Sequence, residues 1–595
     1  MSSSSRARQR APRFAGNALF HTVAIRGRKY YREAQKGSAA GTSWMRLPQL
    51  ARTEWAVFLT TALAVVGNII WVQEDHQSPA WDQANYLHIS LLWRHGFAHG
   101  GIGGFLRAIY NVAPSFPPLY MLFITPFQAI AVGVGPALVA NTLIYAATIV
   151  AAALIATKLY GQRAAFLSAL FTATCPLLFG LSRTVLVDIL LALLCTLAVM
   201  AIVFSDGFLS TGWSICVGIF AGLAMLTKFT TPAMVIGPAL FGMLLPVKLR
   251  WRRQLRNAAL GTIASLIVTL PWYIPELGPS LTYLHYATSG SGAIGTTPHP
   301  LALPSLFSYL SGVADDGLGA VLAIILLLAA CAVAPAYIRR RPSRTTIARV
   351  AVPLTWLLVP FLVVMTEHNQ DIRFLVPGVV GIAVLASGLL SKIQSSALRK
   401  TFSGIACVVL SWQFVTYIQP VPGFGAAVET LSLSSAGTLV VALQVPLDGQ
   451  ALGYARAPGI PDYAGPILTG LEDASHKLDV SGPLTICLLE SQEVVNTNTI
   501  SFEAAERGDN FLFTDLSYIP RMSAPQLASA LTACPLALYI PPAPSAYVGR
   551  VAVLNSASAA ARITPPELAQ FDVLRPNYPV GNGLNVEILE RKHRP

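Results

Sequence analysis

Two carboxylates, Asp75 and Asp82, follow the first long apolar run of the sequence, and the Pro-rich run Phe116–Tyr120 comes after them. Ionisable side chains close to the hydrocarbon core of a membrane are costly, and they usually line a functional site. Two acids at this place therefore indicate chemistry rather than anchoring. We expect Asp82 to act on a substrate that is delivered at the membrane edge.

The composition predicts an integral membrane protein. Of the 595 residues, 54% are hydrophobic and 12% are charged, whereas soluble chains carry roughly 25% charged residues. The formal net charge of +13 could indicate binding to nucleic acid. The basic residues cluster beside apolar runs, however, where they report membrane orientation. We therefore expect no nucleic acid partner.

A helix needs about 20 residues to cross a bilayer. Apolar runs of suitable length lie near residues 55–72, 136–157, 164–181, 184–204, 212–227, 232–247, 257–275, 318–338, 350–366, 374–390 and 401–418. We expect each of these runs to form a spanning helix. One more run, 116–133, is ambiguous.

The basic loops decide how this ambiguous run is placed, because cytoplasmic loops are enriched in Lys and Arg. The N-terminal tail and the loops 248–256, 339–349 and 392–400 are the most basic segments, so all four are predicted to be cytoplasmic. An even number of crossings must then separate the tail from Lys248. Pro117, Pro118 and Pro126 interrupt the run 116–133, so we expect it to lie along the outer membrane surface. The prediction is about 11 spanning helices plus this surface segment.

This orientation divides the sequence into three parts. Residues 1–54 form a basic cytoplasmic tail without a visible signal peptide, and 55–418 form the transmembrane catalytic domain. That domain has a first external loop at 73–135 and a long external loop at 276–317. Residues 419–595 contain short apolar runs that alternate with helix-like segments, which predicts an extracytoplasmic α/β domain. No Gly-rich phosphate motif follows these runs, so no nucleotide is assigned.

Two cysteines, Cys487 and Cys534, lie in the predicted external domain. An external compartment permits a disulfide between them. Their spacing does not indicate one, and two buried thiols are the alternative.

Several short segments of the chain resemble a known family. These segments are Trp81–Tyr86, Phe116–Tyr120, Tyr160–Ala165, Ser182–Asp188, Gly222–Lys228 and Arg373–Pro377. In their order and predicted side they resemble the C-type glycosyltransferases that use polyprenyl-phosphate sugars. The resemblance is to the group that holds the protein O-mannosyltransferases and the lipid A aminoarabinose transferase, glycosyltransferase family 39 and its relatives. Gln83 stands where the family often has Glu, and Phe116 where it often has Lys or His.

The resemblance implies an enzyme of the external face of a bacterial inner membrane. Its donor would be a polyprenyl-phosphate-linked sugar held among membrane lipid, and its acceptor an unidentified hydroxyl. Asp82 would be the general base, because a positioned carboxylate can remove the hydroxyl proton, and Asp188 would join it as a catalytic residue. Cations stabilise a departing phosphate. The predicted substrate-binding residues are Asp75, Tyr86, Arg183, Lys228, His368 and Arg373.

Structural roles stay open for the same residues. Asp82 could cap a helix, Asp188 could make structural hydrogen bonds, and Lys228 could extend its amine to the membrane interface. Arg373 could pair with Asp371 or Glu367 in a solvated cluster.

Other functions stay open as well. No cofactor is expected, although a divalent metal held by Asp75, Asp82 and His368 is an alternative, without a compact ligand spacing to favour it. A transporter or flippase for a lipid-linked sugar would share the phosphate contacts without needing a base. A third interpretation is a membrane-anchored receptor in which the C-terminal domain carries the function.

Overall fold

The computed structural model describes most of the chain from residue 46 onward. The described residues are 46–74, 79, 81–288, 301–339, 342–418, 428–432, 438–442, 463–478, 483–489, 495–516, 529–539, 571–581 and 584–592. Most of the predicted basic tail, Asp75 and part of the predicted loop 276–317 lie outside these residues. The chain divides into two compact units, Met1–Trp55 and Ala56–Pro595. The features below concern the second unit, apart from Arg46–Trp55, the first residues of helix α2.

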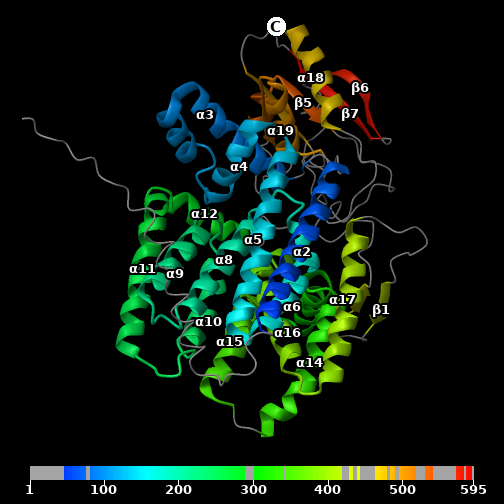
Figure 1. Cartoon of the computed structure of the whole chain (residues 1–595). Helices are drawn as coiled ribbons and strands as arrows, with labels where there is room; N and C mark the ends of the chain where they lie inside the picture. Colours follow the sequence, from blue (N-terminus) through cyan, green and yellow to red (C-terminus); the bar gives the residue numbers. More distant parts are fainter. Residues whose placement is uncertain are drawn as a thin grey trace, which may run out of the picture. The chain divides into compact units, whose positions relative to one another are not determined.

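The first part of this unit is built from apolar helices (Figure 1). They are α2 (Arg46–Glu74), α3 (Asp82–Asn111), α4 (Leu119–Ile130), α5 (Val134–Tyr160), α6 (Gln162–Ala173), α7 (Pro176–Leu181), α8 (Val187–Phe204), α9 (Thr211–Met225), α10 (Thr231–Gly242), α11 (Trp251–Tyr273), α12 (Leu277–Thr288), α13 (Leu303–Gly312), α14 (Ala320–Arg339), α15 (Arg344–Val364), α16 (Val376–Lys392) and α17 (Ser396–Ile418), with the short turns η2 (Val313–Gly317) and η3 (Ile372–Leu375). A helical, membrane-type fold is therefore confirmed.

Five helices of the described part are long and apolar enough to cross a membrane, or six if one bent pair counts as a single span. The five are Arg52–Gln73, Val134–Tyr160, Val187–Phe204, Arg344–Val364 and Ile372–Lys392. The bent pair is α11 with the first part of α12, which meet at 91°. Several other apolar helices are shorter, so the count of about 11 spans stays a prediction.

Proline positions explain two differences between the apolar runs and the helices. The run 164–181 is divided into α6 and α7, and Pro176 begins the second helix. Proline restrains the residue before it to extended backbone, which ends the preceding helix. In the run 116–133, Pro118 precedes α4, which has 12 residues. Such a helix is about 18 Å long, shorter than the roughly 30 Å hydrocarbon core.

The predicted long loop 276–317 contains regular structure where it is described. Helix α12 begins directly after Glu276, and α13 is followed by η2. Tyr283 of α12 packs against Phe116, with ring centroids 4.8 Å apart. The segment is therefore partly a pair of helices, and the first of them contacts the first predicted external loop.

The helix core is centred on α5, α8 and α16. Of the 18 most apolar consecutive residues, 78% are buried in α8 and 83% in the span that contains α16. In α2 only 22% of such residues are buried, so most of this helix is not covered by other parts of the protein. The buried N-terminal end of α8 and the turn that leads into α16 carry ionisable residues described below.

A five-stranded sheet occupies part of the predicted external domain. Its order is β4 (Phe511–Asp515), β3 (Leu484–Leu488), β5 (Leu536–Tyr539), β7 (Leu584–Arg591) and β6 (Phe571–Gly581). Strand β3 pairs in parallel with β4 and β5, whereas β7 is antiparallel to β5 and β6. Helices α18 (Ala464–Leu478) and α19 (Thr497–Arg507) accompany it, and β1 (Val428–Ser432) and β2 (Thr438–Ala442) form a separate hairpin. Cys487 and Cys534 form a disulfide.

Helices α9 and α11 approach each other at two glycines. A Cβ atom added to Gly218 would lie 1.7 Å from the carbonyl oxygen of Gly261. Small residues permit such backbone contact between membrane helices. We predict that Gly218→Ala separates α9 from α11 and lowers the stability by about 1–3 kcal/mol, as overpacking does. The measurement is the unfolding temperature of the purified protein in detergent.

Gly212→Ala is the matched control in the same helix, because a Cβ atom there meets nothing within 4 Å. Alanine is also the better helix former by about 0.5–1 kcal/mol, so this variant should be no less stable than the parent. Equal unfolding temperatures for the two variants would show that the contact is not tight.

Candidate active site

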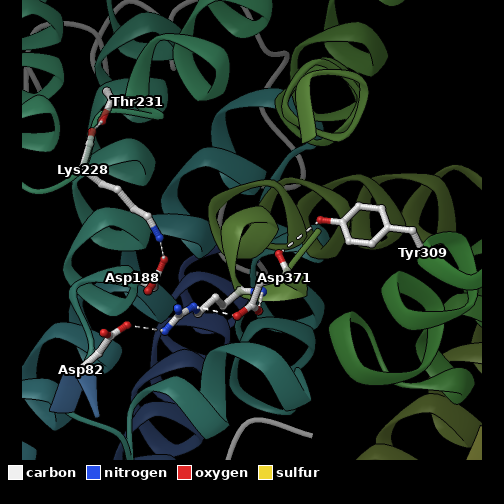
Figure 2. A network of polar contacts seen from close by, with 7 residues as sticks. Asp82, Asp188, Lys228, Thr231, Tyr309 and Asp371 are labelled. Carbon is white, nitrogen blue, oxygen red and sulfur yellow. Dashed lines mark hydrogen bonds and ion pairs between the residues drawn. The ribbon is translucent and has the colours of Figure 1, made fainter. Parts of the chain in front are cut away.

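The most buried charge of the site is the Asp188 carboxylate. Asp188 is the second residue of α8, is 1% exposed, and forms an ion pair with Lys228 at an Nζ–Oδ1 distance of 2.6 Å. Figure 2 shows the Lys228 side chain reaching Asp188. The partial positive charge of a helix N-terminus also favours a carboxylate at this place. The acid is therefore stabilised by both a cation and a helix end.

Local hydrogen bonds fix the turn that carries Lys228. The turn connects α9 to α10, and the Lys228 backbone N–H donates to the Ala224 carbonyl. The Thr231 hydroxyl donates to the Lys228 carbonyl at 2.9 Å. Lys228 thus has a defined backbone from which its side chain reaches α8.

A second ion-pair group surrounds Arg373 in η3. Its Nη1 atom lies 3.2 Å from Asp82 Oδ2, and its Nε atom lies 2.9 Å from Asp371 Oδ2. Asp371 caps η3, because its side chain also accepts the Arg373 backbone N–H. The Tyr309 hydroxyl donates to the Asp371 carbonyl at 3.4 Å, a contact drawn in Figure 2. Two carboxylates therefore hold one guanidinium.

The two ion-pair groups meet at one aromatic ring. Lys228 Nζ lies 4.2 Å from the centroid of the Phe374 ring, and Arg373 Cζ lies 5.7 Å from it. Cations within about 6 Å of a ring face are attracted to it. Phe374 consequently brings the cations of two separate segments to one place. Both charges therefore lie within 6 Å of one ring centroid.

Asp82 begins α3 without capping it. The capping position belongs to Trp81, whose φ is 47°, and no side chain caps the helix. Such a φ is strained for a bulky residue. The Gln83 side-chain oxygen accepts the Val185 N–H at 3.0 Å, which fastens the start of α3 to the segment before α8. The Asp82 side chain, 45% exposed, is the most accessible carboxylate of the site.

Tyr86 is buried one turn after Asp82. Its ring meets Phe116 edge-on at 6.1 Å and Tyr120 at 6.0 Å. Burial, and next the nearby Asp82 charge, raise the pKa of Tyr86 well above its ordinary value. Tyr86 is therefore a neutral phenol at physiological pH, and it packs α3 against the Pro-rich run.

The remaining predicted residues lie elsewhere. Arg183 is 2% exposed, and its guanidinium lies 3.4 Å from the Phe179 ring centroid and 4.8 Å from that of Trp71. Its Nε donates to Asn68 of α2 at 3.2 Å. His368 lies in the turn after α15. The structure therefore brings together Asp82, Tyr86, Asp188, Lys228 and Arg373, while Arg183 contacts other elements.

Three neighbours of this site are not among the residues predicted for it: Gln83, Asp371 and Phe374. The sequence suggested Asp371 only as one possible partner of Arg373 in a solvated cluster. Nothing in the sequence indicated that Gln83 would reach Val185 or that Phe374 would contact Lys228. In the described part of the chain, no group of three or more His, Cys, Asp or Glu side chains could hold a metal ion.

The burial of Asp188 makes Lys228 important for stability. We predict that Lys228→Met lowers the free energy of unfolding by about 3–5 kcal/mol, because it leaves a buried carboxylate without its cation. The double variant Lys228→Met/Asp188→Leu should recover much of this loss. Detergent unfolding curves of both variants provide the measurement.

Lys158→Met is the control, since its partner Asp206 has a side chain that is 61% exposed. Exposed pairs contribute about 0–1 kcal/mol. A loss for Lys228→Met no larger than that of the control would contradict a structural role for the buried pair.

Residues 115–274 match the family described as dolichyl-phosphate-mannose-protein mannosyltransferase. Curated protein sequences give no match to the chain. Among solved structures, ArnT from Cupriavidus metallidurans in the apo state is similar at a TM-score of 0.54 and 15% identity, over 91% of this chain and 98% of that chain. The same protein bound to undecaprenyl phosphate gives 0.53 and 16%, over 90% and 98%.

Arabinofuranosyltransferase AftD from Mycobacteria is similar at a TM-score of 0.53 and 12% identity, over 91% of this chain and 40% of that chain. At such identities the likenesses concern the fold. The resemblance drawn from the sequence motifs is confirmed. The chain has the fold of the C-type glycosyltransferases, and its residues 115–274 carry the sequence pattern of the dolichyl-phosphate-mannose-protein mannosyltransferase family.

Proposed function

We propose that the protein transfers a sugar from a polyprenyl-phosphate donor to an acceptor hydroxyl at the external face of a bacterial inner membrane. The observation that carries the proposal is the meeting of Lys228 and Arg373 at Phe374, beside the accessible carboxylate of Asp82. The ArnT structure with undecaprenyl phosphate supports a lipid-phosphate ligand for this fold.

The two cations would bind the donor phosphate, which becomes the leaving group. Positive charge near a departing phosphate stabilises the charge that grows on it in the transition state. Arg373 suits this role because a guanidinium has five N–H donors, and the two contacts to Asp82 and Asp371 use one donor nitrogen each. Lys228 would add a point charge at the same Phe374 ring.

Asp82 would serve as the base. Its carboxylate pairs with Arg373 in the structure. A bound phosphate competes for the same guanidinium, so donor binding would release Asp82 to face the acceptor. The acceptor oxygen then forms a bond to the anomeric carbon, and the bond from that carbon to the phosphate oxygen breaks. The phosphate leaves with the electron pair, and Asp82 takes the hydroxyl proton.

Asp188 would act through Lys228 in this scheme. Its carboxylate is buried and lies 2.6 Å from the amine, so it sets where the Lys228 charge stands. The other residues predicted to bind substrate have supporting roles: Tyr86 packs α3 in place, and His368 lies in the segment that leads to η3. Asp75, outside the described residues, stays a predicted contact.

Asp82→Asn should lower turnover by about 10²- to 10⁴-fold, the usual contribution of a positioned base, while donor binding is retained. The assay follows covalent transfer from a labelled polyprenyl-phosphate sugar to a candidate acceptor. Asp473→Asn is the control, because Asp473 forms an exposed pair with Arg575 in the α18 region. Full turnover by Asp82→Asn would show that Asp82 is not the base. Movement of donor between leaflets without any transfer would favour a flippase.

Arg373→Gln should instead raise the donor KM by at least about tenfold, because the site loses a charged phosphate contact. Arg373→Lys should recover this loss in part, since Lys keeps the charge without the planar fork. Arg575→Gln is the control. An unchanged KM in Arg373→Gln, with correct folding, would place the donor phosphate elsewhere.

A further inference from the structure

A basic cavity lies at the opposite end of α8 from Asp188. Its volume is about 560 Å³, and its lining includes the cations Lys158, Lys248, Arg250 and Arg349. Asp188 is near the first residue of α8, whereas Val203 near its last residue lines this cavity. A helix of 18 residues is about 27 Å long. The cavity is therefore about one hydrocarbon thickness away from the candidate active site.

The cations of this cavity exceed its carboxylates. Asp206 is the one acidic residue in the described lining, and it pairs with Lys158 at 3.1 Å. In the described part of the chain, no ion pair engages Lys248, Arg250 or Arg349. The cavity therefore keeps a surplus of positive charge. A ligand that neutralises it has to be an anion.

The loop at the cavity wall is held in an unusual backbone. Asp206, Gly207 and Phe208 all have positive φ, at 50°, 64° and 68°. Residues in such conformations persist when surrounding contacts impose them, and they cluster at ligand clamps and similar sites. Only glycine fits at position 207, because a Cβ atom there would lie 2.2 Å from the Gly242 carbonyl oxygen.

Buried amides impose this loop. Gln254, 0% exposed, donates to the carbonyls of Gly207 and Met243, each at 2.8 Å. Asn257, also 0% exposed, donates to the Phe208 carbonyl at 2.8 Å. The connection between α8 and α9 is thereby tied to α11 and to the end of α10. The cavity wall is a built structure rather than a loose surface loop.

The far side of the cavity is fixed in a similar way. Arg344 at the start of α15 donates to the carbonyls of Pro246 and Val247 at 2.8 Å each. Helices α10 and α15 pack side by side and carry these segments (Figure 1). The Tyr160 hydroxyl donates to the Arg349 carbonyl at 2.6 Å, which joins the end of α5 to α15. Several helix ends thus share one basic cavity.

The lining is apolar between its cations. Leu159, Val203, Leu209, Leu245 and Val247 contribute to it, and Val247 is 83% exposed. Trp251, at the start of α11, is 47% exposed, and Trp is enriched where membrane meets water. An occupant with both a phosphate group and hydrocarbon matches these surroundings better than a small soluble anion does.

We propose that this cavity binds the phosphate headgroup of an anionic phospholipid in the membrane leaflet opposite the candidate active site. Basic pockets between helix ends are known to take diphosphate lipid headgroups. A volume of about 560 Å³ falls within the range of roughly 300–1,000 Å³ that is typical of ligand sites. The lipid would hold the ends of α5, α8 and α15 together at this membrane surface.

The test uses the full chain in detergent, titrated with cardiolipin and followed by native mass spectrometry. Lys248→Gln/Arg250→Gln/Arg349→Gln should weaken cardiolipin binding by about a hundredfold, from the loss of three phosphate-directed charges. The charge-retaining variant Lys248→Arg/Arg250→Lys/Arg349→Lys should bind like the parent, which separates lost charge from lost folding. Phosphatidylcholine should bind the parent far more weakly.

The matched control removes three other exposed charges: Arg252→Gln/Arg253→Gln/Lys400→Gln. It should change cardiolipin binding less than threefold. An equal loss of cardiolipin affinity in the control would show that binding depends only on the overall surface charge, and it would overturn the proposal. Inorganic phosphate should not displace cardiolipin at millimolar concentration. Displacement by phosphate alone would assign the cavity to a soluble anion and also overturn it.

Discussion

A carboxylate that is almost completely buried has to be compensated, and in this protein Lys228 compensates Asp188. An unpaired charge in such surroundings costs several kcal/mol, on the order of 3–5 when one partner of a buried pair is removed. This requirement fixes the turn between α9 and α10 against the start of α8. The same amine lies over Phe374 of η3, so the turn that leads into α16 lies at the same place. The candidate site is assembled from distant segments around this pair.

Asp82 is positioned by contacts on both sides of it. After it, Gln83 accepts the Val185 N–H. Before it, the Pro79 carbonyl accepts the Thr499 hydroxyl at 2.9 Å, and Phe502 of the same helix, α19, packs into the helical core. The strained Trp81 lies between these anchors. A carboxylate placed in this way has little freedom except in its own side chain, which suits the proposed exchange of Arg373 for an acceptor.

The sequence indicated many of the residues of the site but not which of them contact each other. Asp82, Asp188, Lys228 and Arg373 could be named because ionisable residues are rare beside apolar runs and because short motifs accompany them. The pairing of Asp188 with Lys228 joins residues 40 positions apart, and no local pattern encodes such a contact. Arg183 had the same motif support, yet it stacks on Phe179 and bonds to Asn68. Charge and position in the sequence did not show that Lys228 belongs to the site and that Arg183 lies elsewhere.

The same limit applies to the fold. Hydropathy indicated the membrane character, because apolar runs of this length are typical of helices that cross a bilayer. It did not indicate the break between α6 and α7, or the helices α12 and α13 in a segment without strong periodicity. These features depend on proline geometry and on tertiary contacts such as that of Tyr283 with Phe116.

The most direct measurement is an experimental structure of the protein with a bound polyprenyl phosphate. We predict that the phosphate lies between Lys228 and Arg373, with Asp82 displaced from the guanidinium. A phosphate bound away from both cations, with the Asp82–Arg373 pair intact, would contradict it.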